Sequence, residues 1–178
     1  HVVAEHHPYP KPVVDLRLGR GCSWGKCAFC AIQSHQQGYR SGDPEHVAAS
    51  MLSAYKTLGT TFFRIRDDLV TPPQLRKLTL AIRALPFQPR WMVRGRFNAG
   101  FTPSLLQEAR AAGLEEMWMG LESGSPRVRE LMDKGVAQAD VVRILHDAAD
   151  VGLRIRALCI VGFPGETDAE FQETVSFI

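Results

Sequence analysis

The sequence alternates between short apolar runs and longer segments of helical periodicity, and this alternation limits the possible folds more than any other feature. The apolar runs have the length of buried strands and lie at residues 13–18, 60–66, 90–96, 115–121 and 154–163. The helical segments lie at residues 44–57, 73–85, 103–112, 126–132 joined with 138–151, and 167–178. Strands that alternate with helices form right-handed crossovers, so the sequence predicts a parallel α/β sheet.

The predicted helices carry recognisable start and stop signals. Three of them begin with a capping residue followed by proline, at Asp43, Thr71 and Thr102. Three are followed by a glycine that can end a helix, at Gly59, Gly113 and Gly152. Each of these glycines leads directly into a predicted strand, which supports the assignment of repeated helix-to-strand units.

The length of the chain limits how far such a fold can close. A closed barrel of eight units usually needs about 250 residues, and this chain has 178 residues and about five units. We therefore expect an incomplete barrel or an open parallel sheet, with functional groups at the C-terminal ends of the strands. Residues 1–12 are expected to be an extended lead-in and residues 13–178 a core, cut from a longer protein because no stop signal follows the last helical segment.

Composition excludes several classes of protein. The 21 basic and 19 acidic residues give a net charge of +2, which predicts no strong field for nucleic acid or an anionic membrane. No run of 18 apolar residues is present, and residues 1–12 do not resemble a secretory signal. Four cysteines, three of them within nine positions, make a poor disulfide framework. These features favour a reducing compartment such as the cytoplasm.

Three cysteines follow the first predicted strand in the segment GRGCSWGKCAFCAIQ. Cys22, Cys27 and Cys30 have the spacing C-x4-C-x2-C, and the glycines of this segment allow the tight turns that would bring the three sulfurs together. Clustered thiolates select iron–sulfur clusters or zinc over hard ions such as magnesium. The segment therefore predicts a metal centre at the C-terminal end of the first strand.

Three kinds of centre are compatible with this spacing. Structural zinc needs four ligands, and the nearby candidate for the fourth is His35. A plant-type ferredoxin cluster also needs a fourth cysteine, and Cys159 lies within the fifth predicted strand, where a small buried side chain is the expected role. A 4Fe–4S cluster held by three thiolates, with one iron open, needs no distant residue.

The segment GCSWGKCAFC resembles the cluster loop of radical S-adenosylmethionine (radical SAM) enzymes. Further matches follow in order along the chain, in RIRDDLVT, GLESGSPRVRELMDKG and CIVGFPGETDAEFQETVSFI. The last two are similar to the cobalamin-binding and methylthiotransferase-like branch of the superfamily. The first gap between cysteines is one residue longer than the commonest spacing, C-x3-C-x2-C, which bears on the subfamily more than on the superfamily. The resemblance implies a partial parallel (βα) TIM-like barrel.

The resemblance also implies cofactors and a reaction. Cys22, Cys27 and Cys30 would hold a 4Fe–4S cluster whose open iron binds the amino and carboxylate groups of SAM. Reductive cleavage would release methionine and a 5′-deoxyadenosyl radical, which acts on a substrate that the sequence does not identify, or would support radical and cobalamin-dependent methyl transfer. A protein such as flavodoxin or ferredoxin would deliver the electron. Any cobalamin would be bound by a domain outside this chain.

Contacts to SAM follow from the same resemblance. Phe29 would lie near the adenine, would shield the cluster, or would do both. Asp67 or Asp68 would receive the SAM amino group, unless they only end a strand. Arg94 or Arg96 would meet the SAM carboxylate; a structural ion pair with Asp67, Asp68 or Glu122 is the alternative.

The remaining expected contacts lie at the ends of the fourth and fifth strands. Glu122 would bind the ribose or amino group of SAM, and Ser123 would support it or cap the next helix. Gly162 and Gly165 would let the backbone approach the adenine, or would only form a turn before a helix capped by Thr167. Four other large side chains are expected to serve packing alone, namely Trp91, Met117, Trp118 and Met119.

Overall fold

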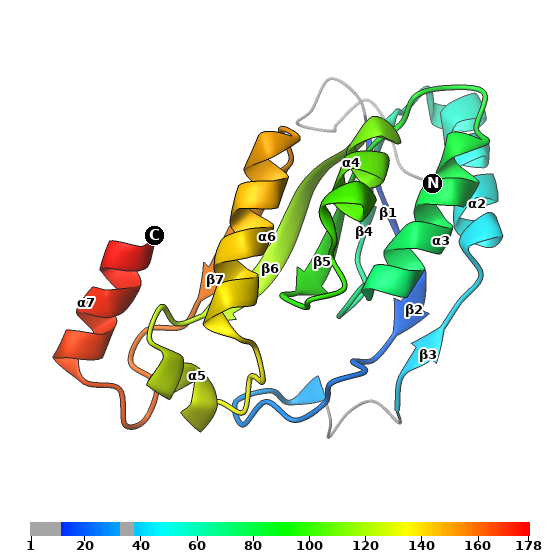
Figure 1. Ribbon diagram of the computed structural model, residues 1–178. Helices are drawn as coiled ribbons and strands as arrows, with labels where there is room; N and C mark the ends of the chain where they lie inside the picture. Colours follow the sequence, from blue (N-terminus) through cyan, green and yellow to red (C-terminus); the bar gives the residue numbers. More distant parts are fainter. Residues whose placement is uncertain (1–11, 33–37) are drawn as a thin grey trace.

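The computed structural model describes residues 12–32 and 38–178, and a single parallel sheet forms its centre (Figure 1). The order of the strands is β1-β4-β5-β6-β7, and every neighbouring pair is parallel. These strands are β1 (Val13–Leu16), β4 (Phe62–Ile65), β5 (Arg90–Arg96), β6 (Leu114–Glu122) and β7 (Arg154–Cys159). Within the described residues β1 and β7 have one neighbour each, so the sheet is open. The predicted parallel α/β sheet of five strands is confirmed.

Helices cover one face of this sheet. The described helices are α2 (Pro44–Leu58), α3 (Pro72–Arg83), α4 (Pro103–Ala111), α5 (Pro126–Leu131), α6 (Gln138–Asp150) and α7 (Asp168–Phe177). Of these, α2, α3, α4 and α6 form a row, each in contact with the next (Figure 1). None of the helices in the described parts of the chain is long and apolar enough to cross a membrane.

The two faces of the sheet differ in polarity. Large apolar side chains of the strands are fully buried in the core, among them Phe63, Trp91, Val93, Met117 and Met119. Side chains that alternate with them carry charge and form ion pairs between strands, such as Arg64 with Asp15 and Arg156 with Glu116. Because residues two apart along a strand share a face, one face packs under the helices and the other is polar.

The predicted helix boundaries are largely confirmed. Asp43 accepts a hydrogen bond from the Glu45 amide at 3.0 Å, and Thr71 and Thr102 accept from the amides three residues later. Gly59 adopts a left-handed conformation with φ of 64°, as a helix stop requires. The joining of residues 126–132 and 138–151 into one helix is wrong. Asp133 and Gly135 have φ of 48° and 57°, and these left-handed residues separate α5 from α6.

Two predictions of buried packing are also corrected. Cys159 is exposed, because it ends the edge strand β7 and no described strand covers that edge. Trp118 is only partly buried, because it lies on the polar face of β6, between Arg94 of β5 and Arg156 of β7. Trp91, Met117 and Met119 are fully buried as predicted.

A short hairpin and one buried carboxylate fix the chain as it leaves β1. Strands β2 (Gly19–Arg20) and β3 (Arg40–Ser41) pair in antiparallel fashion. Between β1 and β2, the Leu18 amide donates to Asp67 Oδ1 at 2.8 Å. Asp67 follows β4 and is 1% exposed. Burial raises the pKa of the Asp67 carboxyl from its ordinary 3.8 to about 6, although the Leu18 amide opposes that shift.

We predict that ionisation of Asp67 makes stability depend on pH. The folded state binds the Asp67 proton more tightly than the unfolded chain, so the free energy of unfolding should fall as pH rises from about 4 to about 6, by at most about 3 kcal/mol. Asp67→Asn keeps an oxygen that accepts from Leu18 and has no charge to bury. The variant should be more stable than the natural protein above pH 6, with the difference shrinking towards pH 4. Urea unfolding across this range measures it, and parallel pH curves for the two proteins would contradict the assignment.

Candidate functional site

Three of the four cysteines line one cavity at the C-terminal ends of the strands. The cavity has a volume of about 440 Å³, within the range of ligand sites. Its lining combines thiols with charged, aromatic and apolar side chains: Cys22, Cys27, Phe29, Cys30, Ile32, Asp68, Leu69, Arg94, Gly95, Arg96, Trp118, Gly120, Glu122, Lys134 and Leu158. Eight of the predicted site residues therefore line one cavity: Cys22, Cys27, Cys30, Phe29, Asp68, Arg94, Arg96 and Glu122. The cysteines are free thiols.

The start of the cysteine segment is held by the end of β4. We call residues 19–32 the cluster loop. The Gly21 amide donates to Asp68 Oδ2 at 3.1 Å, just beyond the contact that Leu18 makes with Asp67. The two carboxylates therefore bind successive parts of the chain. Asp67 binds the residue before the cluster loop, and Asp68 binds the loop itself and lines the cavity.

The middle of the cluster loop contacts residues 132–135, which we call the docking turn. The Ala28 amide donates to the Met132 carbonyl at 2.9 Å. The Trp24 indole Nε1 donates to the Asp133 carbonyl at 2.8 Å. Both acceptors are carbonyls at the end of α5 that no longer continue a helix, so the break between α5 and α6 supplies the attachment points.

Arg96 also connects the cluster loop to the docking turn. Its guanidinium donates to the Lys134 carbonyl, at 3.0 Å from Nε, and also to the Gly135 carbonyl. The guanidinium lies 4.1 Å from the centre of the Trp24 ring, which is a cation–π distance. A Cβ on residue 135 would overlap that ring, so the close approach of the turn to Trp24 requires glycine.

A buried ion pair also lines the cavity. Lys134 Nζ donates to Glu122 Oε1 at 2.6 Å, and both side chains are largely buried. Lys134 Nζ also lies 5.8 Å from the centre of the Phe29 ring. Burial raises the pKa of the Cys27 thiol, and the positive charges of Lys134 and Arg96 oppose that rise. The cavity therefore carries cations where thiolates would accumulate negative charge.

The two predicted arginines have different surroundings. Arg96 donates its hydrogen bonds to the docking turn and Glu122 pairs with Lys134, so these two residues form no ion pair with each other in the described part of the chain. Arg94 lies over the Trp118 ring, 5.3 Å from its centre, and its Nε is buried without a hydrogen-bond partner. Burial lowers the pKa of the Arg94 guanidinium, an effect that the charge of Arg66 reinforces.

Three predicted contacts lie elsewhere. The Ser123 hydroxyl is buried, bonded to Thr174 and accepting from the Ser125 amide, so it supports the turn after β6 without capping α5 through its own side chain. Gly162 and Gly165 form the exposed turn between β7 and α7, with φ of 76° and 88°. None of the three is among the residues that line the cavity.

Within the described residues, the three thiols are not arranged around a single metal ion. Among the described residues, no group of three or more His, Cys, Asp or Glu side chains is arranged to hold one metal ion. Zinc requires its sulfurs to meet at a single ion, whereas in a cluster each thiolate binds a different iron. Cys159 is not part of the cavity lining, and His35 lies outside the described residues.

The sequence did not identify Trp24, Lys134 or Trp118 as site residues. The Asp-Lys-Gly triplet after α5 was an available signal, since Asp and Gly together favour left-handed turns. The alternation of β6 was another, because it places Trp118 on the same face as Gly120. Neither signal shows what a turn or a ring would contact.

Comparison with known proteins gives a consistent result. Residues 16–178 match the family model described as the radical SAM superfamily. The chain is 40% identical over 181 residues to the ribosomal protein uS12 methylthiotransferase RimO of Chlorobium chlorochromatii, covering 95% of this chain and 41% of that protein. It is 27% identical over 170 residues to an uncharacterised methyltransferase of Pyrococcus horikoshii, covering 93% and 36%. The chain thus spans about two fifths of the length of these relatives.

Solved structures share the fold at low sequence identity. The cobalamin-dependent radical SAM enzyme OxsB, with aqua-cobalamin and SAM bound, has a TM-score of 0.78 at 16% identity, covering 93% of this chain and 26% of that one. Coproporphyrinogen III oxidase (HemN) of Escherichia coli has a TM-score of 0.61 at 16% identity, covering 95% and 42%. The predicted partial (βα) barrel is confirmed by this likeness. The match over residues 16–178 shows that the chain belongs to the radical SAM superfamily, a family of enzymes.

Proposed function

We propose that the chain is the core of an enzyme that binds a 4Fe–4S cluster through Cys22, Cys27 and Cys30 and cleaves SAM reductively. The observation that carries the proposal is the gathering of these three free thiols in one cavity at the C-terminal edge of the sheet. When bound and reduced, the cluster supplies the single electron that cleaves SAM into methionine and a 5′-deoxyadenosyl radical.

The residues of the chain hold the cluster loop in place from two sides. Asp68 binds the amide of Gly21 at one end, and the docking turn binds Ala28 and the Trp24 ring further along. Fixing the loop before cofactors bind removes part of the entropy cost of ordering three thiolates. The cations of Lys134 and Arg96 offset the negative charge that those thiolates bring to a partly buried site.

The polar residues of the cavity suit the amino-acid part of SAM. Asp68 and Arg94 line the same cavity with opposite charge, which matches an ammonium and a carboxylate. We assign the carboxylate to Arg94, because Arg96 is committed to the docking turn and the Arg94 Nε has no partner. The ammonium goes to Asp68, because Asp67 is buried against Leu18.

The remaining contacts are assigned to Phe29 and Glu122, which line the same cavity. Phe29 is 38% exposed at the cavity, where it can face the adenine or shield the cluster. Glu122 uses Oε1 for Lys134, which leaves Oε2 to accept from ribose hydroxyls. Ser123, Gly162 and Gly165 stay predictions, because they do not line this cavity.

The proposal extends to the reaction class through the relatives. They are named as methylthiotransferases and a methyltransferase, and one structural neighbour binds cobalamin and SAM. We propose transfer of a methyl or methylthio group to a substrate still to be identified, with any cobalamin held outside this chain. A flavodoxin or ferredoxin would supply the electron, in the cytoplasm, where thiols stay reduced.

Anaerobic reconstitution tests the cluster and its ligands. The purified protein should bind about four iron and four sulfide ions and become brown. Replacement of Cys22, Cys27 or Cys30 by alanine should abolish the cluster, whereas the matched control Cys159→Ala should keep it, since Cys159 is outside the cavity. Iron and sulfide analysis with visible spectroscopy measures the outcome.

The same preparation separates the competing functions. Formation of 5′-deoxyadenosine from SAM and dithionite would support the enzyme. A cluster that is reduced without cleaving SAM would indicate an electron carrier, and a colourless protein with stoichiometric zinc would indicate a structural metal site. A full cluster in Cys27→Ala would refute the ligand assignment.

We also predict that Lys134 raises the reduction potential of the cluster. Its charge favours the more negative reduced state, so Lys134→Met should lower the potential by tens of millivolts, where about 59 mV is a tenfold change for one electron. Redox titration followed by electron paramagnetic resonance measures the shift. Lys134→Arg should keep the potential near its original value, and so should the control Lys56→Met, since Lys56 is exposed on α2. An unchanged potential in Lys134→Met would refute this role.

A further inference from the structure

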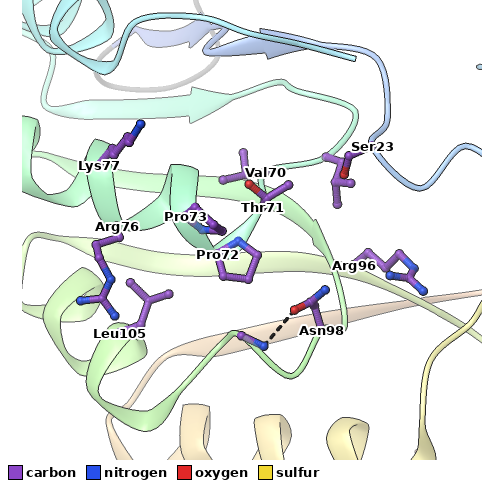
Figure 2. Close-up of a pocket in the computed structure, with 12 residues that line it drawn as sticks. Ser23, Val70, Thr71, Pro72, Pro73, Arg76, Lys77, Arg96, Asn98 and Leu105 are labelled. Carbon is purple, nitrogen blue, oxygen red and sulfur yellow. Dashed lines mark hydrogen bonds between the residues drawn. The ribbon is translucent and has the colours of Figure 1, made fainter. Parts of the chain in front are cut away.

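A second cavity lies between the start of α3 and the loop after β5, and Figure 2 shows its lining. Its volume is about 690 Å³, larger than the thiol cavity. It shares Arg96 and Leu69 with the thiol cavity, and Ser23, next to Cys22, borders it from the cluster loop. Nothing in the proposed binding of cluster and SAM uses this space.

The charge of the cavity lining has one sign. Arg76, Lys77 and Arg96 line the cavity and no acidic residue does. Lys77 has no ion-pair partner anywhere in the described chain, and Arg76 makes only a long contact of 3.5 Å with Glu108. The thiol cavity, by contrast, contains both Asp68 and Glu122. The second cavity is therefore suited to an anion, because the protein leaves the charges of Arg76 and Lys77 largely unpaired.

Neutral polar groups in the cavity also donate hydrogen bonds. The Asn98 Oδ1 accepts from the Gly100 amide at 2.8 Å, a contact drawn in Figure 2. That contact turns the Asn98 NH₂ group away from Gly100, and in the described residues no acceptor takes it. A ligand oxygen could accept from this amide as well as from the cations.

The start of α3 is not the source of the anion preference. Pro72 and Pro73 have no backbone N–H, and the Gln74 amide is already bonded to Thr71 Oγ1. The preference rests on the side chains Arg76 and Lys77, which project from the next turn of the helix (Figure 2).

The rest of the wall is apolar. Leu69, Val70 and Leu105 are buried at the cavity, and Pro72 and Pro73 add rigid apolar surface. Ligand sites commonly combine such a wall with a few polar groups that fix orientation. We propose that this cavity is a second ligand site, which takes a small molecule with an apolar ring or chain and a carboxylate or phosphate group. The site does not depend on the cluster or on SAM.

Binding of simple compounds by the purified protein tests the proposal. Phenyl phosphate and benzoate combine a ring with the two kinds of oxyanion; inorganic phosphate and benzyl alcohol each lack one part. Backbone amide shifts in nuclear magnetic resonance spectra should report saturable binding at α3 and residues 98–105, with dissociation constants on the order of millimolar for molecules of this size. The stronger binder of phenyl phosphate and benzoate identifies the oxyanion.

Matched variants locate the site. Lys77→Gln and Arg76→Gln should weaken binding about fivefold or more, because each removes one charge-assisted contact. Lys56→Gln, on the exposed surface of α2, should change nothing. All three residues are exposed, so the variants should fold. Absence of saturable binding, equal binding of inorganic phosphate and phenyl phosphate, or full affinity in Lys77→Gln would each overturn the proposal.

Discussion

The attachment of the cluster loop at its start and along its middle is the interaction on which the site depends. The loop has almost no regular structure, and three cysteines in a free loop would cost conformational entropy to align. Hydrogen bonds from the Gly21 and Ala28 amides, to Asp68 and to the Met132 carbonyl, supply the constraint. Their acceptors lie 64 residues apart, so the site requires both β4 and α5 to be in place around the loop.

The polarity of the sheet explains why the charged groups gather where they do. One face is apolar under the row of helices, and the alternation of the strands leaves the other face to side chains such as Arg94 and Trp118. At the C-terminal ends this polar face meets the cluster loop. Arg96 lines both the thiol cavity and the second cavity, and its bonds to the docking turn fix its guanidinium there.

Features that depend on local pattern can be predicted from the sequence, whereas features that depend on distant contacts cannot. The strand at 90–96 and the caps at Asp43 and Thr71 follow from alternation and side-chain chemistry within a few residues. The docking turn could not be read in this way, because its shape matters through contact with Trp24, more than 100 residues earlier. The exposure of Cys159 likewise depends on what borders β7, and no pattern within that strand reports it.

Polar residues that support the fold differ from those that can bind a ligand in whether the protein already satisfies their hydrogen bonds. The sequence predicted Asp67 and Arg96 as ligand contacts. In the structure, their hydrogen bonds to Leu18 and to the docking turn stabilise the fold instead. Arg94 is the reverse, since its Nε is buried without a partner. An unpaired buried donor costs about 1–3 kcal/mol, a cost that an incoming oxygen would relieve. A group that folding leaves unsatisfied at the wall of a cavity is thus the best structural sign of where a ligand completes the protein.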